Sequence, residues 1–369
     1  MKVPNIVTKF FQVGCAVFVS LSGYTIFTDI TRANINNIAE KLPAPTNPQF
    51  PETPVPPPEN TWQRVRLLHN IKAHWGPIYA LTFSPDGKYL ASGGTDIDTK
   101  IRLWNPIKGN RIRTITAHSN RVLALAITPD NLTIASGSED TTLNIWSLKN
   151  GKLSRSLTHD FSNILSMAIT PDGQTLVSGG LDGIRLIDLK TERLLYTRVP
   201  LSQPIVYAVA ISPNGQILAT GGRDTKIYLW NIQNSQFLGT IPGHQGAITS
   251  LAFSPDGNTL VSGSYDHTVK VWNLTTRRSF TLVGHQNIVN SVTVHPDGRT
   301  VASAGRDGVR IWDLRSGQQI RSIMIDTDWI QTVAFSPDGN FLATGAFDGK
   351  LKIWEGINKN FPIDFGENQ

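Results

Sequence analysis

The sequence has 369 residues, a formal net charge of +6, nine tryptophans, 31 glycines and one cysteine, Cys15. A charged fraction of 17% and a hydrophobic fraction of 40% exclude a disordered or coiled-coil chain, and one cysteine excludes an intramolecular disulfide. The basic excess is small and forms no run, so we expect no nucleic-acid partner.

The first predicted element lies in residues 1–30. Residues 10–28 carry no charge, follow Lys2 and Lys9, and are just long enough to cross a membrane as a helix. We predict an uncleaved anchor. A cleaved signal peptide is the alternative, because Ser20-Leu21-Ser22 is a small-x-small site. The positive residues come first, so either interpretation puts the rest of the chain on the non-cytoplasmic side, membrane-anchored or else secreted or periplasmic.

Residues 31–61 form a predicted proline-rich linker. Eight of the sixteen residues from 43 to 58 are proline, and five recur at every third position: Pro45, Pro48, Pro51, Pro54 and Pro57. Proline fixes φ and lacks an N–H donor, so this stretch is predicted to be an extended polyproline II segment. We interpret it as a stalk, with a ligand for a proline-recognition groove as the alternative.

Residues 62–357 contain one motif seven times, followed by a tail, residues 358–369. The fullest copy begins at Gly243-His244, contains Ser254-Pro255-Asp256-Gly257 and ends at Trp272-Asn273. Its closing position recurs every 40 to 43 residues, at Trp104, Trp146, Ile187, Trp230, Trp272, Trp312 and Trp354. A period of about 40–45 residues with these ends is typical of propeller blades. The chain resembles the WD40-repeat family, which implies an all-β, seven-bladed propeller.

Each motif reads as short strands joined by tight turns. Ser-Pro-Asp-Gly suits such a turn because proline presets φ and glycine accepts the left-handed conformation. In the second copy Asn131 takes the glycine position. The last copy lacks a fourth strand, so we predict that residues 63–71 supply it and close the ring.

The resemblance also implies a buried Trp–Ser–His–Asp network in each blade. Four sets are complete: Trp104, Ser92, His74 with Asp96 or Asp98; Trp146, Ser136, His118, Asp140; Trp272, Ser262, His244, Asp266; and Trp312, Ser303, His285, Asp307. The third, fourth and seventh copies lack a member and are expected to be looser. His267 and His295 lie outside the network and are expected at the surface.

In this family the usual binding surface lies where the entrances to the inner strands meet the turns before the network aspartates. Residues at these positions vary between copies, so the repeat does not explain them. They are rich in aromatic residues and arginine, the types that dominate interfaces. The predicted partner-binding residues are Trp75, Tyr79, Arg121, Tyr207, Arg223, Tyr265, Arg306, Trp329 and Phe347.

The sequence contains no HExxH, phosphate-loop, Gly-x-Ser-x-Gly or Cys/His metal motif. The recurring His, Ser and Asp argue for structure, since an enzyme needs one site and not one per blade. We therefore predict a non-catalytic, monomeric scaffold without cofactor or metal that binds a protein or peptide. The alternative is an exported propeller that binds a glycan or cell-wall polymer, and an enzyme is the least favoured class.

Overall fold

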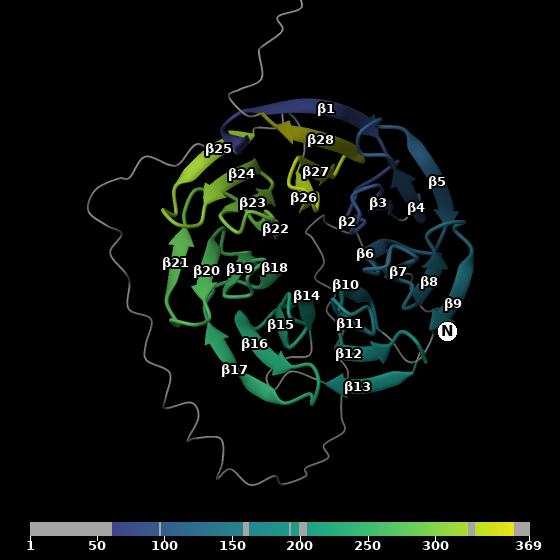
Figure 1. Cartoon of the computed structure of the whole chain (residues 1–369), viewed down its shortest axis with the longest axis horizontal. Coiled ribbons are helices and arrows are strands. Elements are labelled where there is room, and N and C mark those ends of the chain that lie inside the picture. Colours follow the sequence, from purple (N-terminus) through teal and green to yellow (C-terminus); the bar gives the residue numbers. More distant parts are fainter. Residues whose placement is uncertain are drawn as a thin grey trace, which may run out of the picture. The chain divides into compact units, whose positions relative to one another are not determined.

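The structure, a computed structural model, describes residues 61–95, 97–157, 162–191, 193–198, 205–323 and 329–357. In this part of the chain 28 strands form seven antiparallel four-stranded sheets, arranged as blades around a central axis (Figure 1). The all-β, seven-bladed propeller is confirmed. Residues 1–60 and the tail lie outside the described residues. Among the described ones, no helix is long and apolar enough to cross a membrane.

The strands of each blade follow one another from the axis outward, with one exception. Blade 1 contains β2 (Ala80–Phe83), β3 (Leu90–Gly93), β4 (Lys100–Trp104) and β5 (Arg111–Thr116), and blade 2 contains β6 (Val122–Ile127), β7 (Thr133–Ser138), β8 (Leu143–Ser147) and β9 (Leu153–Leu157). Blade 3 contains β10 (Ile164–Ile169), β11 (Thr175–Gly180), β12 (Gly183–Asp188) and β13 (Leu194–Arg198), and blade 4 contains β14 (Val206–Ile211), β15 (Ile217–Gly222), β16 (Lys226–Asn231) and β17 (Phe237–Pro242). Blade 5 contains β18 (Ile248–Phe253), β19 (Thr259–Ser264), β20 (Val269–Asn273) and β21 (Ser279–Leu282), and blade 6 contains β22 (Val289–Val294), β23 (Thr300–Gly305), β24 (Gly308–Asp313) and β25 (Gln319–Ile323). Blade 7 contains β26 (Ile330–Phe335), β27 (Phe341–Ala346), β28 (Lys350–Gly356) and β1 (Val65–Lys72), which follows the 3₁₀ turn η1 (Thr61–Gln63).

Blade 7 is the exception because its outer strand comes from the start of the propeller. β1 pairs antiparallel with β28, from Val65 opposite Gly356 to Lys72 opposite Lys350, and Figure 1 shows the purple strand beside the yellow one. The prediction that residues 63–71 close the ring is thus confirmed. This pairing covers the outer edge of β28, which would otherwise present unpaired backbone groups.

A tryptophan outside the repeats anchors this closure. Trp62 in η1 is fully buried, with its ring centre 5.0 Å from that of Phe335 and 6.1 Å from that of His295. The expectation that His295 is a surface side chain is wrong. It holds the first position of its turn, which is buried in every blade, and its Nε2 lies 2.9 Å from the carbonyl oxygen of Gly339.

Glycine is used in the turns for its backbone conformation and at the blade interfaces for its small size. Gly257 has φ of 72° in its turn, and Asn131, which replaces glycine in blade 2, has φ of 60°. Neighbouring blades share apolar clusters, such as Val261 of blade 5 with Val289 and Trp312 of blade 6. A Cβ on Gly263 would lie 2.8 Å from a Val289 methyl group, so close packing of these blades requires glycine there.

Candidate binding face

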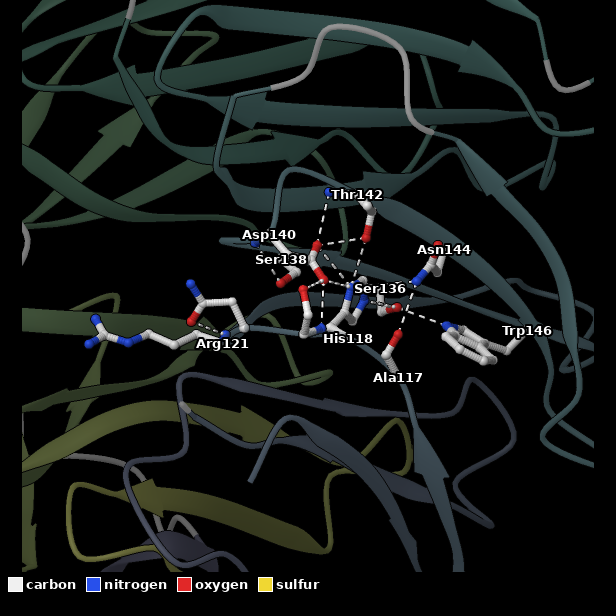
Figure 2. A network of polar contacts seen from close by, with 11 residues as sticks. Ala117, His118, Arg121, Ser136, Ser138, Asp140, Thr142, Asn144 and Trp146 are labelled. Atoms are coloured by element: carbon white, nitrogen blue, oxygen red, sulfur yellow. Dashed lines mark hydrogen bonds and ion pairs between the residues drawn. The ribbon is translucent and has the colours of Figure 1, made fainter. Parts of the chain in front are cut away.

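Buried polar networks support one face of the propeller, shown for blade 2 in Figure 2. The Trp146 indole N–H donates to Ser136 Oγ at 2.8 Å, and His118 Nε2 lies 2.7 Å from the same oxygen. His118 Nδ1 lies 3.1 Å from Asp140 Oδ2 and 2.9 Å from Thr142 Oγ1. Because an indole only donates, the Ser136 hydroxyl hydrogen is left for Nε2, which favours the tautomer whose Nδ1–H donates to Asp140.

Blades 5 and 6 repeat this arrangement. Trp272 donates to Ser262 at 2.9 Å, and His244 Nε2 and Nδ1 lie 2.7 Å from Ser262 Oγ and 2.9 Å from Asp266. In blade 6 the corresponding three distances, for Trp312, Ser303, His285 and Asp307, are 2.8, 2.7 and 2.7 Å. The structure therefore brings together the residues of both sequence-predicted sets.

In blade 1 the side chain of Arg102 joins the network. Trp104 and His74 meet at Ser92 Oγ, at 2.9 and 2.8 Å, and the aspartate is Asp98. Arg102 Nη1 lies 2.7 Å from His74 Nδ1 and 2.5 Å from Asp98 Oδ2. Because a guanidinium only donates, this contact favours the opposite histidine tautomer, with the proton on Nε2.

Asp98 stands 24 residues after His74, whereas the other three aspartates stand 22 after their histidines. The turn of blade 1 is thus two residues longer. The residue immediately before its aspartate is Ile97, which is 84% exposed, and not Thr95, which is 5% exposed. The sequence left Asp96 or Asp98 open as the network aspartate, and Asp96 would have put Thr95 immediately before it, so Ile97 was not among the predicted residues. Asp96 lies outside the described residues.

The three incomplete blades use different substitutes. In blade 4 the Tyr228 hydroxyl donates to Asp224, and Trp230 donates to Thr220 at 3.1 Å. In blade 3, Ile187 is buried and Arg185 Nη1 donates to Asp182 at 2.8 Å. In blade 7 the bond from Trp354 to Thr344 is 3.4 Å long. The segments of these blades where the network histidine would stand contain His159, Ser202 and residues 326–328, and all of them lie outside the described residues.

Burial sets the charge state of the networks. It lowers the pKa of His74, His118 and His285, and the neighbouring carboxylates only partly oppose this effect. Burial alone would raise the pKa of Asp140, but hydrogen bonds from Thr142 and the Ser119 amide, together with the charge of His118, lower it. At neutral pH the three histidines are therefore neutral beside charged aspartates.

The aspartates also fix the loop that follows each histidine. Asp140 accepts from the Ser119 amide at 2.9 Å, and Asp98 accepts from the Trp75 amide at 3.4 Å. These loops and the turns holding the aspartates form what we call the upper face, and the Ser-Pro-Asp-Gly turns form the lower face. In blade 1 the residue held in this way is a tryptophan with 76% of its surface exposed.

An aromatic and cationic patch runs across the upper face over blades 6, 7 and 1. The Arg306 guanidinium lies 3.7 Å from the centre of the Trp329 ring, and the centres of Trp329 and Phe347 are 5.3 Å apart. The turn after Phe347 reaches blade 1, where Gly349 O accepts from the His74 amide at 3.0 Å. We call Arg306, Trp329, Phe347, Trp75 and Ile97 the seam patch.

The other predicted partner-binding residues lie apart from the seam patch. Tyr79 and Tyr207 line the axial channel, as do Leu123, Leu165, Thr249, Asn290 and Gln331. Tyr265 and Arg223 are exposed on blades 5 and 4, and Arg121 Nε lies 3.3 Å from Glu139 on blade 2. The channel has a volume of about 180 Å³, below the range of about 300–1,000 Å³ typical of small-molecule sites. No group of three or more His, Cys, Asp or Glu in the described ranges is arranged to hold a metal ion.

Comparison with known families gives two matches. The sequence model of the IFT122 first β-propeller matches residues 97–355, and that of the WD domain, G-beta repeat, matches residues 65–105.

Individual relatives share only part of the chain. It is 33% identical over 82 residues to Periodic tryptophan protein 2 of Arabidopsis thaliana, which covers 22% of this chain and 9% of that protein. It is 35% identical over 88 residues to WD repeat domain-containing protein 83 of Homo sapiens, covering 24% and 26%. It is 33% identical over 75 residues to COMPASS component SWD3 of Saccharomyces cerevisiae, covering 20% and 23%. The matched segments span about a quarter or less of these relatives.

Proposed function

Because this chain belongs to the WD40-repeat β-propeller family, we propose that it is a non-catalytic scaffold that binds a protein or peptide through the seam patch. The stacked pair of Arg306 and Trp329, together with the exposed Trp75 of blade 1, carries this proposal. Tryptophan and arginine are the residues most enriched at the centres of protein interfaces. Among the relatives, SWD3 is by its name a component of an assembly.

The burial of the His–Ser–Asp sets supports a non-catalytic role. Ser92, Ser136, Ser262 and Ser303 are fully buried, and each hydroxyl oxygen already accepts from an indole N–H. A nucleophilic hydroxyl must reach a substrate carbonyl, and these four do not reach the surface. Their geometry instead stiffens the loops that present the patch.

The patch suits a segment with an apolar anchor next to a carboxylate. Trp329, Phe347 and Trp75 offer ring faces for an aliphatic or aromatic side chain. Arg306 places a positive charge over one of these rings, where a carboxylate of the partner would pair with it. Fixed loops imply little backbone change on binding.

The test is crosslinking and capture from the native source with three forms of the full chain. One is wild type, one carries Trp75→Ala with Trp329→Ala, and the control carries Leu132→Ala with Leu153→Ala, which removes two exposed leucines of blade 2. We expect the same partner with wild type and control and its loss with the tryptophan variant. Equal recovery with all three forms would refute the seam patch as the binding site. Retention on a polysaccharide that depends on the two tryptophans would favour the glycan-binding alternative.

We further propose that residues 10–28 hold the propeller on the non-cytoplasmic side of a membrane. The support is the charge pattern, with Lys2 and Lys9 before the uncharged stretch. Membrane fractionation and intact mass of the full chain test this. Full-length protein in the membrane pellet supports the anchor, whereas a soluble product shortened by about 22–33 residues supports a cleaved signal peptide.

A further inference from the structure

A second candidate site lies on the lower face, at the seam between blades 7 and 1. It is a groove of about 600 Å³ lined by Tyr89, Ile107 and Ile112 of blade 1 and by Pro337 and Phe341 of blade 7. Its volume is within the range of about 300–1,000 Å³ found for ligand sites. Ile107 is 69% exposed although it is a large apolar residue.

The groove exists because blade 1 lacks a hydrogen bond that the other six blades make, five of them through an aliphatic residue. In these five blades the aliphatic residue after the closing position donates its amide to the turn between the first two strands, as Leu148 does to Leu132 O at 2.8 Å and Leu274 to Asn258 O at 2.8 Å. Blade 1 has Pro106 at this position, and proline has no N–H to donate. The turn of blade 1 therefore does not accept this hydrogen bond. The apolar side chain of blade 1 stands one residue later, at Ile107, where the same five blades have Lys149, Lys190, Gln233, Thr275 and Arg315.

The walls of the groove are also specific to this seam. Two residues after the turn glycine, blades 1 and 7 carry Tyr89 and Phe341, whereas the other blades have Thr133, Thr175, Ile217, Thr259 and Thr300. Two aromatic residues thus face one groove only where blades 7 and 1 adjoin. The repeat alone does not require this coincidence.

We propose that this groove holds the proline-rich segment of the same chain, centred on residues 51–58. The described chain begins beside the blade 7 turn that forms one wall of the groove, with η1 packed toward blade 6, where Arg321 Nη1 donates to Gln63 O at 2.8 Å. A Cβ on Gly356 would lie 3.4 Å from Thr61 O, and the Gly356 amide donates to Asn340 O at 3.3 Å, one residue before Phe341. In a polyproline II conformation of about 3.1 Å per residue, residues 58–60 would span about 10 Å and the whole stretch from 43 to 58 about 50 Å.

The chemistry of the groove matches this occupant. Grooves walled by tyrosine and other flat rings bind proline-rich segments, because proline rings pack on aromatic faces. Prolines at every third position put one row of rings on one edge. A polyproline II segment is already ordered, so little conformational entropy is lost on docking, and attachment to the same chain raises its local concentration. This inference does not depend on the proposed function, because it concerns the opposite face.

Disulfide trapping in the full chain tests the inference. In a Cys15→Ser background, Val55→Cys is combined with Ile107→Cys in the groove or with Arg315→Cys, the same repeat position in blade 6, on which the start of the described chain also packs. Both target side chains are exposed, and they lie on the two blades that flank blade 7, where the described chain begins, so an undocked tether would have no preference for the groove. We expect oxidation to join Val55→Cys to Ile107→Cys at least about tenfold faster. Adding Tyr89→Thr, the residue of most other blades, should remove this preference, with an unchanged melting temperature showing that the propeller is folded.

Each other outcome overturns the inference. Equal rates at the two positions, or no crosslink at either, mean that the segment stays out of the groove. A crosslinked dimer through Ile107→Cys means that the segment of a second copy occupies it. Retention of the preference in the Tyr89→Thr protein would show that the aromatic wall is not the binding surface.

Discussion

Arg306 and Trp329 lie on different blades, yet the guanidinium of the first stacks 3.7 Å from the ring centre of the second. The turn between β23 and β24 carries Arg306, and the entrance to β26 carries Trp329. The pair therefore bridges blades 6 and 7 on the upper face and sets the orientation of both side chains before a partner arrives.

The first prediction concerns this pair. Arg306→Ala is expected to weaken partner binding about tenfold, and Trp329→Ala about 10- to 100-fold, as for residues at the centre of an interface. Arg306→Lys is the matched control. It keeps the charge but loses the planar stacking, so its affinity should fall between those of wild type and Arg306→Ala. Calorimetric titration with the captured partner measures these affinities, and wild-type affinity in Arg306→Ala would contradict the prediction.

The second prediction compares a complete network with an incomplete one. Ser262 Oγ contacts both Trp272 and His244, whereas Thr220 Oγ1 accepts a hydrogen bond from Trp230. Each buried polar group left without a hydrogen-bond partner costs about 1–3 kcal/mol of stability. Ser262→Ala should therefore lower the free energy of unfolding by about 2–4 kcal/mol and Thr220→Val by about 1–2 kcal/mol. Urea unfolding compares them, and equal losses would show that the histidine link adds nothing.

The third prediction is that acid destabilises the propeller. Burial lowers the pKa of His74, His118 and His285 in the folded state. Below about pH 6.5 the unfolded chain therefore binds protons that the folded chain does not, and the free energy of unfolding falls. The aspartates Asp98, Asp140 and Asp307 also have a lowered pKa when folded, so their stabilisation is full above about pH 4–5 and is lost in stronger acid.

Urea midpoints at several pH values between 7.5 and 4 check this prediction. We expect a steady decrease that begins near pH 6.5, and His118→Gln should make the decrease shallower. A midpoint that stays constant from pH 7.5 to 5 would exclude this role for the histidines.

The fourth prediction concerns closure of the ring. Trp62→Ala empties a fully buried site against Phe335 and should lower the free energy of unfolding by about 3–5 kcal/mol. Arg66→Ala is the control. It removes the 2.6 Å ion pair with Glu355, but the Arg66 side chain is 62% exposed, so its loss should cost less than about 1 kcal/mol. Similar melting temperatures for the two variants would mean that Trp62 does not anchor the closure.

The repeat made the architecture predictable because its period and its turns recur. Residues that the repeat shares, such as Ser262 and Asp266, could be assigned to a network, and residues 63–71 to the missing strand. Trp62 could not be found in this way, because it precedes the motif and no other blade has a counterpart. His295 was misplaced because a histidine outside the network was expected at the surface, whereas its position, the first of the turn, is buried in every blade.

The positions of the candidate binding residues were predictable, but the directions of their side chains were not. The variable positions do lie around the inner-strand entrances, yet Tyr79 and Tyr207 line the axial channel, and exposed Ile97 was not among the predicted residues. Whether a side chain at an entrance turns inward or outward depends on neighbouring blades, which are distant in sequence. The lower groove depends on the missing N–H of Pro106, which becomes informative only when compared with the bond made by Leu148.

The pairing of β1 with β28 also has a consequence for biosynthesis. Arg66 and Glu355 touch, yet they are 289 residues apart in the chain. At a translation rate of about 5–20 residues per second, β28 leaves the ribosome about 15–60 s after β1. Of the described strands, β1 is thus the first to be made and the last to find its partner, and a premature stop before Lys350 leaves its edge open to other chains. Such truncated products should aggregate or be degraded, and should not persist as smaller propellers.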